Sequence, residues 1–272
     1  MFKQEDLNKL KDYTFAFLEV EHKENVLTIT LDRAEKKNAL HPVTANELAF
    51  ALTYAKHNKD VWAVVIKANG DVFCAGADLK AFMTGGGDTD TTVPKAEGEI
   101  LIGELFNELH KPCIAQVEGD AFAGAFLLLA GCTHVVAAND VKFGLPEVKR
   151  GLFPYQVMAS LLQVMPERKV LDWCIQGYNL DAQKAADWGL VTHLAERGKV
   201  ADAVQELLET ILTNSPTAIR MGLEAYQHIR SEDTKSQHSY LRGMLMKTVQ
   251  TKDAQEGIMA FREKRKPEWK NE

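Results

Sequence analysis

The sequence predicts an α/β fold that continues into a helical C-terminal region. Over about the first two thirds of the chain, short apolar runs alternate with segments of helical period, which is typical of βαβ units. One helical segment in the middle of the chain is apolar all round and must be buried. From about Tyr155 the pattern is nearly all helical. We therefore expect a core domain over residues 1–198 and a helical region over residues 199–272.

Composition and charge limit the classes of function. With 272 residues, 46% of them hydrophobic and 26% charged, the chain has the composition of a globular protein that can bury a large core. A formal net charge of -6 gives no broad basic surface. Nucleic acid and anionic membrane surfaces are therefore not expected as partners.

The cysteines and the N-terminus indicate a compartment. Cys74, Cys113, Cys132 and Cys174 form no CxxC pair, which argues against a zinc site or a redox motif and fits a reducing compartment. The N-terminus lacks the apolar stretch of a secretory signal, and the longest apolar run, 121–130, is too short to span a bilayer. We expect a cytoplasmic protein.

The first elements are two strands, a helix and a third strand. Residues 15–20 and 25–31 predict strands around a turn. Pro42 suits the first turn of a helix in which apolar residues recur at helical spacing. The apolar run 61–67, which ends at Asn69-Gly70, predicts a buried strand and a tight turn.

The following elements alternate in the same way. Residues 84–92 are rich in Gly, Thr and Asp and predict a mobile loop, and residues 100–110 predict a helix stopped by Pro112. Strands are expected at 113–117 and 133–138. Between them, small residues mark a strand-to-helix turn that leads into the apolar helix. Residues 181–189 predict a short helix with an N-cap aspartate and a terminating glycine.

Four segments in this order resemble the crotonase (enoyl-CoA hydratase/isomerase) superfamily. The resemblance spans about residues 15–270 and implies the ClpP/crotonase-like fold, a repeated ββα core with a helical C-terminal oligomerisation region. The segments are LDRAEKKNAL (31–40), FCAGADLK (73–80), VEGDAFAGAFLLLAGC (117–132) with FGLPEVKRGLFP (143–154), and DAQKAADWGLV (181–191) with DAQEGIMAFREKRKPEW (253–269).

The resemblance implies an oxyanion hole for an acyl-CoA thioester. Chemistry beside a thioester carbonyl passes through an enolate-like state, whose oxygen can be stabilised by two backbone N–H groups. By resemblance these are the amides of Ala77 and Ala125, the latter opening the apolar helix. Alanine occupies 123 and 125, where many relatives have glycine. The alternative is that both segments are only tight turns with close packing.

Further substrate contacts are carried over from the same motifs. Coenzyme A belongs to the substrate, and neither a separate cofactor nor a metal is expected. Lys37 and Lys264 have an alternative role as solvated surface charges. Phe261 and Lys264 are expected to reach the site of a neighbouring subunit. The residues expected to contact substrate are Lys37, Ala75, Asp78, Leu79, Lys80, Gly124, Leu127, Phe261 and Lys264.

The acid–base residues favour one reaction of the family. Many hydratases use two glutamates, but here Leu127 occupies the position of the first, and only Glu147 remains. A single carboxylate suits Δ3,Δ2-enoyl-CoA isomerisation, in which one base moves a proton and no water is activated. We favour this reaction over hydration by Glu147 alone and over non-catalytic acyl-CoA binding. Glu118 or Asp120 is an alternative second carboxylate.

Self-association is also implied by the resemblance, which predicts a homotrimer or a homohexamer built as a dimer of trimers. Apolar faces in the helical region, such as that of Val204, Leu207 and Leu208, fit burial against other subunits. None of the eight histidines has metal-ligand spacing in the sequence. RNA binding, which is found in a superfamily member with basic surface features, has little support in this acidic chain.

Overall fold

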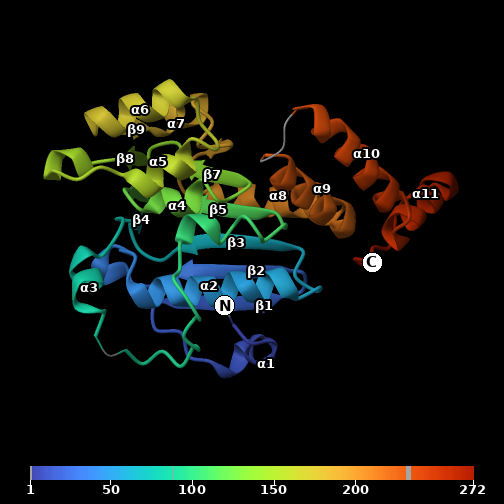
Figure 1. The fold of residues 1–272 in the computed structure, drawn as a ribbon, viewed down its shortest axis with the longest axis horizontal. Helices are drawn as coiled ribbons and strands as arrows, with labels where there is room; N and C mark the ends of the chain where they lie inside the picture. Colours follow the sequence, from blue (N-terminus) through green and yellow to red (C-terminus); the bar gives the residue numbers. More distant parts are fainter. Residues whose placement is uncertain (1, 88, 231–233) are drawn as a thin grey trace.

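The computed structural model describes residues 2–87, 89–230 and 234–272, with side chains omitted also at 234 and 235. Figure 1 shows two sheets, the helices that cover them and a group of C-terminal helices. The mixed α/β fold expected from the sequence is confirmed, and so is the helical C-terminal region.

The larger sheet has six strands in the order β1-β2-β3-β5-β7-β10. β1 is antiparallel to β2, and all other neighbours are parallel. Parallel strands buried on both faces read as continuous apolar runs, which explains why β3 and β5 were recognisable in the sequence. The strands are β1 Leu18–Lys23, β2 Val26–Leu31, β3 Ala63–Ala68, β5 Cys113–Val117, β7 His134–Ala138 and β10 His193–Ala195.

The smaller sheet has four short strands in the order β4-β6-β8-β9. β4, β6 and β8 are parallel to one another, and β9 is antiparallel to β8. Because each strand has only three residues, the alternation that would mark it in the sequence is too short to detect. The strands are β4 Val72–Cys74, β6 Asp120–Phe122, β8 Lys142–Gly144 and β9 Asn179–Asp181.

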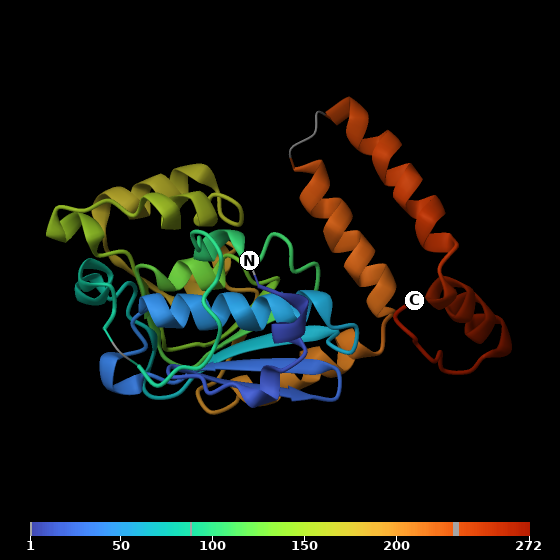
Figure 2. The ribbon, with the colours of Figure 1, turned by 60° about the horizontal axis from the view of Figure 1, so that its bottom comes forward.

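Helices cover the sheets and then extend away from them. α2 crosses the larger sheet and contacts β1 and β2, whereas α8 packs against β5, β7 and β10. α9, α10 and α11 project from the core as an arm (Figure 2). The helices are α1 Gln4–Leu7, α2 Pro42–His57, α3 Leu79–Thr84, α4 Ala125–Leu129, α5 Tyr155–Leu161, α6 Glu167–Gln176, α7 Ala182–Asp187, α8 Val200–Leu212, α9 Pro216–Ile229, α10 Thr234–Val249 and α11 Lys252–Glu263.

Most of the expected elements are confirmed. The strand at 113–117 has the expected bounds, and α2 begins at Pro42. Every residue of α4 is buried, as an apolar helix requires. Asp181 caps α7 by accepting a hydrogen bond from the amide of Lys184, and Gly189 follows the helix with a φ of 88°.

The prediction of a helix at residues 100–110 is wrong. Only the 3-10 helix η3 (Ile102–Glu104) forms there, and the turns that follow are closed by bonds between residues three apart. The apolar spacing that predicted a helix comes from Ile102, Phe106 and Leu109, which are all buried. Turns can bury this face equally well, because residues three apart are stacked in a 3-10 conformation.

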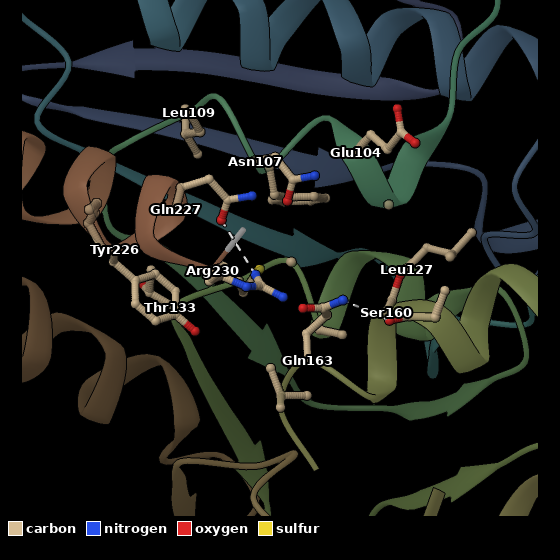
Figure 3. A pocket seen from close by; sticks show the side chains of 18 of the residues that line it. Glu104, Asn107, Leu109, Leu127, Thr133, Ser160, Gln163, Tyr226, Gln227 and Arg230 are labelled. Atoms are coloured by element: carbon tan, nitrogen blue, oxygen red, sulfur yellow. Dashed lines mark hydrogen bonds between the residues drawn. The ribbon is translucent and has the colours of Figure 1, made fainter. Parts of the chain in front are cut away.

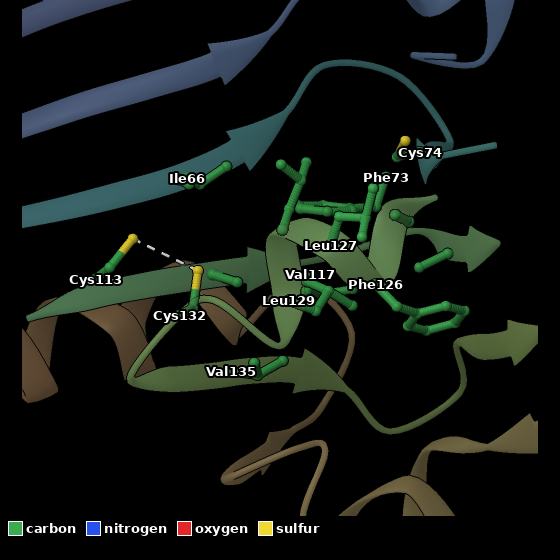
Figure 4. Close-up of a cluster of buried hydrophobic side chains, with 14 of the residues drawn as sticks. Ile66, Phe73, Cys74, Cys113, Val117, Phe126, Leu127, Leu129, Cys132 and Val135 are labelled. Carbon is green, nitrogen blue, oxygen red and sulfur yellow. Dashed lines mark hydrogen bonds between the residues drawn. The ribbon is translucent and has the colours of Figure 1, made fainter. Parts of the chain in front are cut away.

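A continuous apolar core joins the two sheets through α4. Figure 4 shows Phe126, Leu127 and Leu129 of this helix among side chains from β3, β5 and β7. Cys113 and Cys132 meet here with their Sγ atoms 3.5 Å apart, and all four cysteines are free and buried. The core therefore fixes the helix whose first residues face the site described below.

Nothing in the described part of the chain is a helix both long enough and apolar enough to cross a membrane. The boundary expected at residue 198 remains a prediction. Since α8 packs on the larger sheet, the helices that leave the core begin with α9.

Candidate active site

Three parallel strands end at the same edge of the smaller sheet. β4 pairs with β6 through Cys74 and Ala121, and β6 pairs with β8 through Phe122 and Gly144. Ligands in open α/β sheets bind at the carboxyl ends of such strands. The segments that leave these ends are 75–78, 123–125 and 145–147, which contain the residues expected to act on substrate.

The backbone N–H of Ala77 is not used in the pairing of its segment with Leu40. Ala77 forms an isolated parallel bridge with Leu40, in which Leu40 donates to the carbonyl of Gly76 at 2.7 Å and accepts from the amide of Asp78 at 2.9 Å. This bridge uses the groups on either side of Ala77 and leaves its own N–H without a protein partner in the described residues. Ala77 is exposed, so this donor can reach a ligand.

The two turns approach each other so closely that Gly76 has no room for a side chain. A Cβ at Gly76 would lie 2.6 Å from Cβ of Ala123 and 3.0 Å from the amide nitrogen of Gly124. A Cβ at Gly124 would lie 3.3 Å from the amide nitrogen of Ala77. The backbone amides of Ala77 and Gly124 therefore line one small space between the turns.

Ala125 and Gly124 differ in how far they are exposed at this space. Ala125 is the first residue of α4 and is 0% exposed, whereas Gly124, its N-cap, is half-buried. Neither amide donates to another group among the residues that the structure describes. Exposure thus favours Gly124 over the expected Ala125 as the donor nearest a ligand.

Asp78 fixes the turn on the β4 side. Its carboxylate accepts from the amide of Ala81 at 3.0 Å, which caps α3, and from Nη1 of Arg33 at 2.8 Å. These two bonds, first the amide and then the guanidinium, hold the pKa of Asp78 below its usual range. The Asp78 side chain is thus engaged within the protein.

The other residues expected to bind coenzyme A lie around this turn. Ala75 donates to the carbonyl of Lys37 at 3.0 Å, which places the Lys37 segment beside β4. Leu79 is 54% exposed, and Lys80 and Lys37 are exposed too. Phe261 is on α11 and Lys264 caps the C-terminal end of this helix, in the arm, on the opposite side of the molecule from α3 (Figure 1). Within one chain they do not contribute to this site, so their expected role there remains a prediction.

Glu147 begins the 3-10 helix η4 (Glu147–Arg150), directly after Pro146 at the end of the β8 segment. Its Oε2 atom is buried and has no hydrogen-bond partner among the residues that the structure describes. Burial raises the pKa of the Glu147 carboxyl, and the weaker opposing effects come from its own backbone and Arg150. An unpaired carboxylate oxygen in a buried position is costly, and a proton or a substrate group would relieve it.

Leu127, in the helix that follows the second turn, lines a cavity of about 890 Å³. Leu127 is 8% exposed and lines this cavity, whereas Ala77 and Glu147 do not. A Cβ at Gly103 would lie 2.8 Å from Oγ of Ser160 and 3.5 Å from Cδ2 of Leu127, so these three residues form one wall. Figure 3 shows Leu127 beside Ser160 at this wall.

The remaining wall of the cavity has both polar and apolar side chains. It comes from segment 101–111, from the end of α4, from α5 and from α9 of the arm. The polar side chains include Asn107, Gln156, Gln163, Gln227 and Arg230. A cavity with these walls can hold a group that forms hydrogen bonds, next to the position of Leu127.

Glu118 and Asp120 lie at the other end of β6 from the site. Asp120 opens this strand and accepts from the amide of Lys142 at 2.8 Å, which joins β6 to β8. Glu118 accepts from the side chain of Gln116 at 2.6 Å. Both carboxylates are engaged away from the carboxyl ends of the strands, and neither replaces a carboxylate at Leu127.

A family model for enoyl-CoA hydratase/isomerase matches residues 21–272. The chain belongs to this family. The resemblance to the crotonase superfamily is thereby confirmed. The family assignment makes the chain a crotonase-type enzyme, and its match covers all three strand ends that form the candidate site.

Relatives of known name agree with this family. A carnitinyl-CoA dehydratase of Escherichia coli O157:H7 is 32% identical over 256 residues, which cover 90% of this chain and 95% of that protein. A mevalonyl-coenzyme A hydratase of Aspergillus fumigatus is 30% identical over 249 residues, 90% of this chain and 92% of that protein. The crystal structure of an enoyl-CoA hydratase from Mycobacterium tuberculosis matches with a TM-score of 0.84 and 33% identity, covering 94% of this chain and all (100%) of that one.

Proposed function

We propose that this crotonase-family protein binds an acyl-CoA thioester with its carbonyl oxygen between the amides of Ala77 and Gly124, and that Glu147 transfers a proton at the acyl chain. The unpaired, buried Oε2 of Glu147 carries this proposal, since a base needs a free lone pair at the reacting carbon. Each donor to a developing oxyanion contributes roughly 3 to 4 kcal/mol in comparable enzymes. The Ala125 amide, buried behind Gly124, continues the same turn and adds its dipole.

Among the reactions of the family, we favour isomerisation of a 3-enoyl-CoA to a 2-enoyl-CoA. Glu147 takes a proton from C2, the electron pair passes to the thioester oxygen as a dienolate, and the same carboxyl returns the proton to C4. No water enters the product. Leu127 supports this reaction because an apolar side chain stands where many hydratases of the family have their first glutamate.

Hydration is the second candidate, and a specific observation favours it. Two relatives of known name are a hydratase and a dehydratase, which add or remove water. In that reaction Glu147 alone would activate the water and return its proton. The polar groups of the cavity beyond Leu127 could hold a hydroxylated acyl group.

One product assay separates these reactions. Purified protein is incubated with trans-3-enoyl-CoA and with trans-2-enoyl-CoA in ¹⁸O-labelled water, and the products are resolved by mass spectrometry. Isomerisation gives 2-enoyl-CoA from the 3-enoyl substrate without label. A labelled 3-hydroxyacyl-CoA as main product would establish hydration instead. Thioester binding without either product would show a non-catalytic acyl-CoA binder.

We also propose that the arm contributes to a homotrimer or to a dimer of trimers. Phe261 is 85% exposed, and Leu245, Met246 and Met259 of the same arm are each more than half exposed. Burial of these side chains by another copy would bring Phe261 and Lys264 near a second site. Multi-angle light scattering tests this proposal, and a monomer at micromolar concentration would refute it.

A further inference from the structure

Two Thr-His pairs begin neighbouring parallel strands. Thr133-His134 opens β7, and Thr192-His193 opens β10. In the register of these strands His193 lies opposite Val136, two residues after His134. Since side chains two residues apart share a face of a sheet, both imidazoles lie on the same face. Their ring centroids are 6.2 Å apart.

The hydroxyl of Thr133 fixes the tautomer of His134. It donates to the carbonyl of Cys113 at 2.9 Å and accepts from the amide of the same residue at 3.0 Å. Because a hydroxyl has only one proton, it can only accept at its 2.9 Å contact with Nδ1 of His134. The neutral ring therefore carries its proton on Nδ1, and Nε2 has a free lone pair.

His193 is fixed in the same way. The hydroxyl of Thr192 donates to the carbonyl of Val135 at 3.0 Å and accepts from its amide at 2.9 Å. Its 2.9 Å contact with Nδ1 of His193 must again be a hydrogen bond from the imidazole. Two adjacent strands thus present two Nε2 lone pairs on one face, each held by a hydrogen bond at Nδ1.

We propose that Nε2 of His134 and Nε2 of His193 bind one divalent transition-metal ion of the class that prefers imidazole, such as Zn²⁺, Ni²⁺ or Cu²⁺. A hydrogen bond at the second ring nitrogen is the usual support of a metal-binding histidine. With metal–nitrogen distances of about 2 Å, two imidazoles on a shared ion have centroids about 5–6 Å apart. The observed separation of the two ring centroids, 6.2 Å, is close to this range.

The small number of protein ligands limits the affinity of this site for a metal ion. No cluster of three or more His, Cys, Asp or Glu suited to a metal occurs in residues 2–87, 89–230 and 234–272, so water completes the coordination. The ion joins β7 to β10 and therefore stabilises the native state.

Calorimetric titration of untagged protein with Zn²⁺ at pH 7.5 tests this proposal. We expect one ion per chain for the wild type and a loss of at least about tenfold in affinity for His134→Ala and for His193→Ala. His238→Ala removes an exposed histidine of α10 and should bind Zn²⁺ as the wild type does. Absent binding in the wild type, or wild-type affinity in either single variant, would overturn the proposal.

A second measurement uses the wild-type protein and needs no variant. Long-range ¹H–¹⁵N spectra of the metal-free protein report which imidazole nitrogen is protonated. We expect the Nδ1–H form for both histidines at neutral pH, and selective shifts of their Nε2 signals when Zn²⁺ is added. An Nε2–H form at either residue would contradict the arrangement on which the site depends.

Discussion

Nη1 of Arg33 lies 2.8 Å from Oδ2 of Asp78, and the two side chains are only 12% and 19% exposed. This pair ties the segment before α2 to the start of α3. Asp78 directly follows Ala77, whose amide lies close to Gly124 and has no partner within the described part of the chain. The ion pair therefore holds the turn that is proposed to bind the thioester oxygen.

Asp78→Ala should destabilise the protein by about 2 kcal/mol, because it removes an N-cap and leaves a largely buried guanidinium without its partner. The free energy of unfolding is measured in urea. Since the folded pKa of Asp78 is lowered, its contribution is present above the ordinary aspartate pKa and is lost as pH falls through the lowered value. The difference between the variant and the wild type should therefore shrink in acid.

Asp202→Ala is the matched control. Asp202 pairs with Lys199 at 2.9 Å, but both side chains are more than 60% exposed, at 64% and 68%. Its loss should change stability by less than about 1 kcal/mol. Equal effects of the two substitutions would show that Asp78 has no special role at the turn.

Gly76→Ala should abolish thioester binding at the candidate site. Gly76 has a φ of 91°, and an added Cβ would press against Ala123 and the Gly124 amide. We expect loss of thioester binding in a fluorescence or calorimetric assay, with destabilisation of more than about 1 kcal/mol.

Gly85→Ala separates backbone strain from the clash. Gly85 has a φ of 75°, but nothing lies within 4 Å of an added Cβ. This variant should show only the cost of the left-handed conformation, about 1 kcal/mol. If Gly76→Ala were no worse than Gly85→Ala in stability, close approach of the turns would not matter.

Glu147→Gln should remove activity and increase stability at neutral pH. Because burial raises the folded pKa of Glu147, the stabilisation due to this carboxyl is present below the ordinary glutamate pKa. This stabilisation is lost as pH rises through the raised pKa. The neutral amide of Gln does not ionise, so the variant does not lose this stability and its melting temperature at pH 7 should be higher than that of the wild type. Its turnover should fall by at least about a hundredfold.

The pH profile and a control complete this prediction. Wild-type turnover should fall as pH drops through the raised pKa, because the base must be ionised. Glu206→Gln, on the exposed side of α8, should alter neither turnover nor melting temperature. Normal turnover in Glu147→Gln, with intact thioester binding, would contradict the proposed function.

Leu127→Glu should increase the ratio of hydration to isomerisation. It introduces a second carboxylate at the wall of the cavity. The ratio is measured as labelled 3-hydroxyacyl-CoA over 2-enoyl-CoA. Leu127→Gln is the control of similar size that cannot accept a proton from water, and an equal change in both variants would attribute the effect to polarity alone.

The α/β class, the buried helix, the two small-residue turns and Glu147 could all be predicted from the sequence. These features depend on short stretches of chain: the apolar run of β5, the apolar circumference of α4 and the small residues before it. Glu147 was recognisable because it follows Pro146 in a family motif. Local chemistry is sufficient for such features.

Which of these groups meet became clear from the folded chain. The approach of Gly76 to Gly124, the burial of Ala125 behind its neighbour and the facing of His134 by His193 all follow from the register of parallel strands. Parallel partners are joined by long crossovers, so their side chains are distant in the sequence. No local pattern can encode which residue of one strand lies opposite which residue of the next.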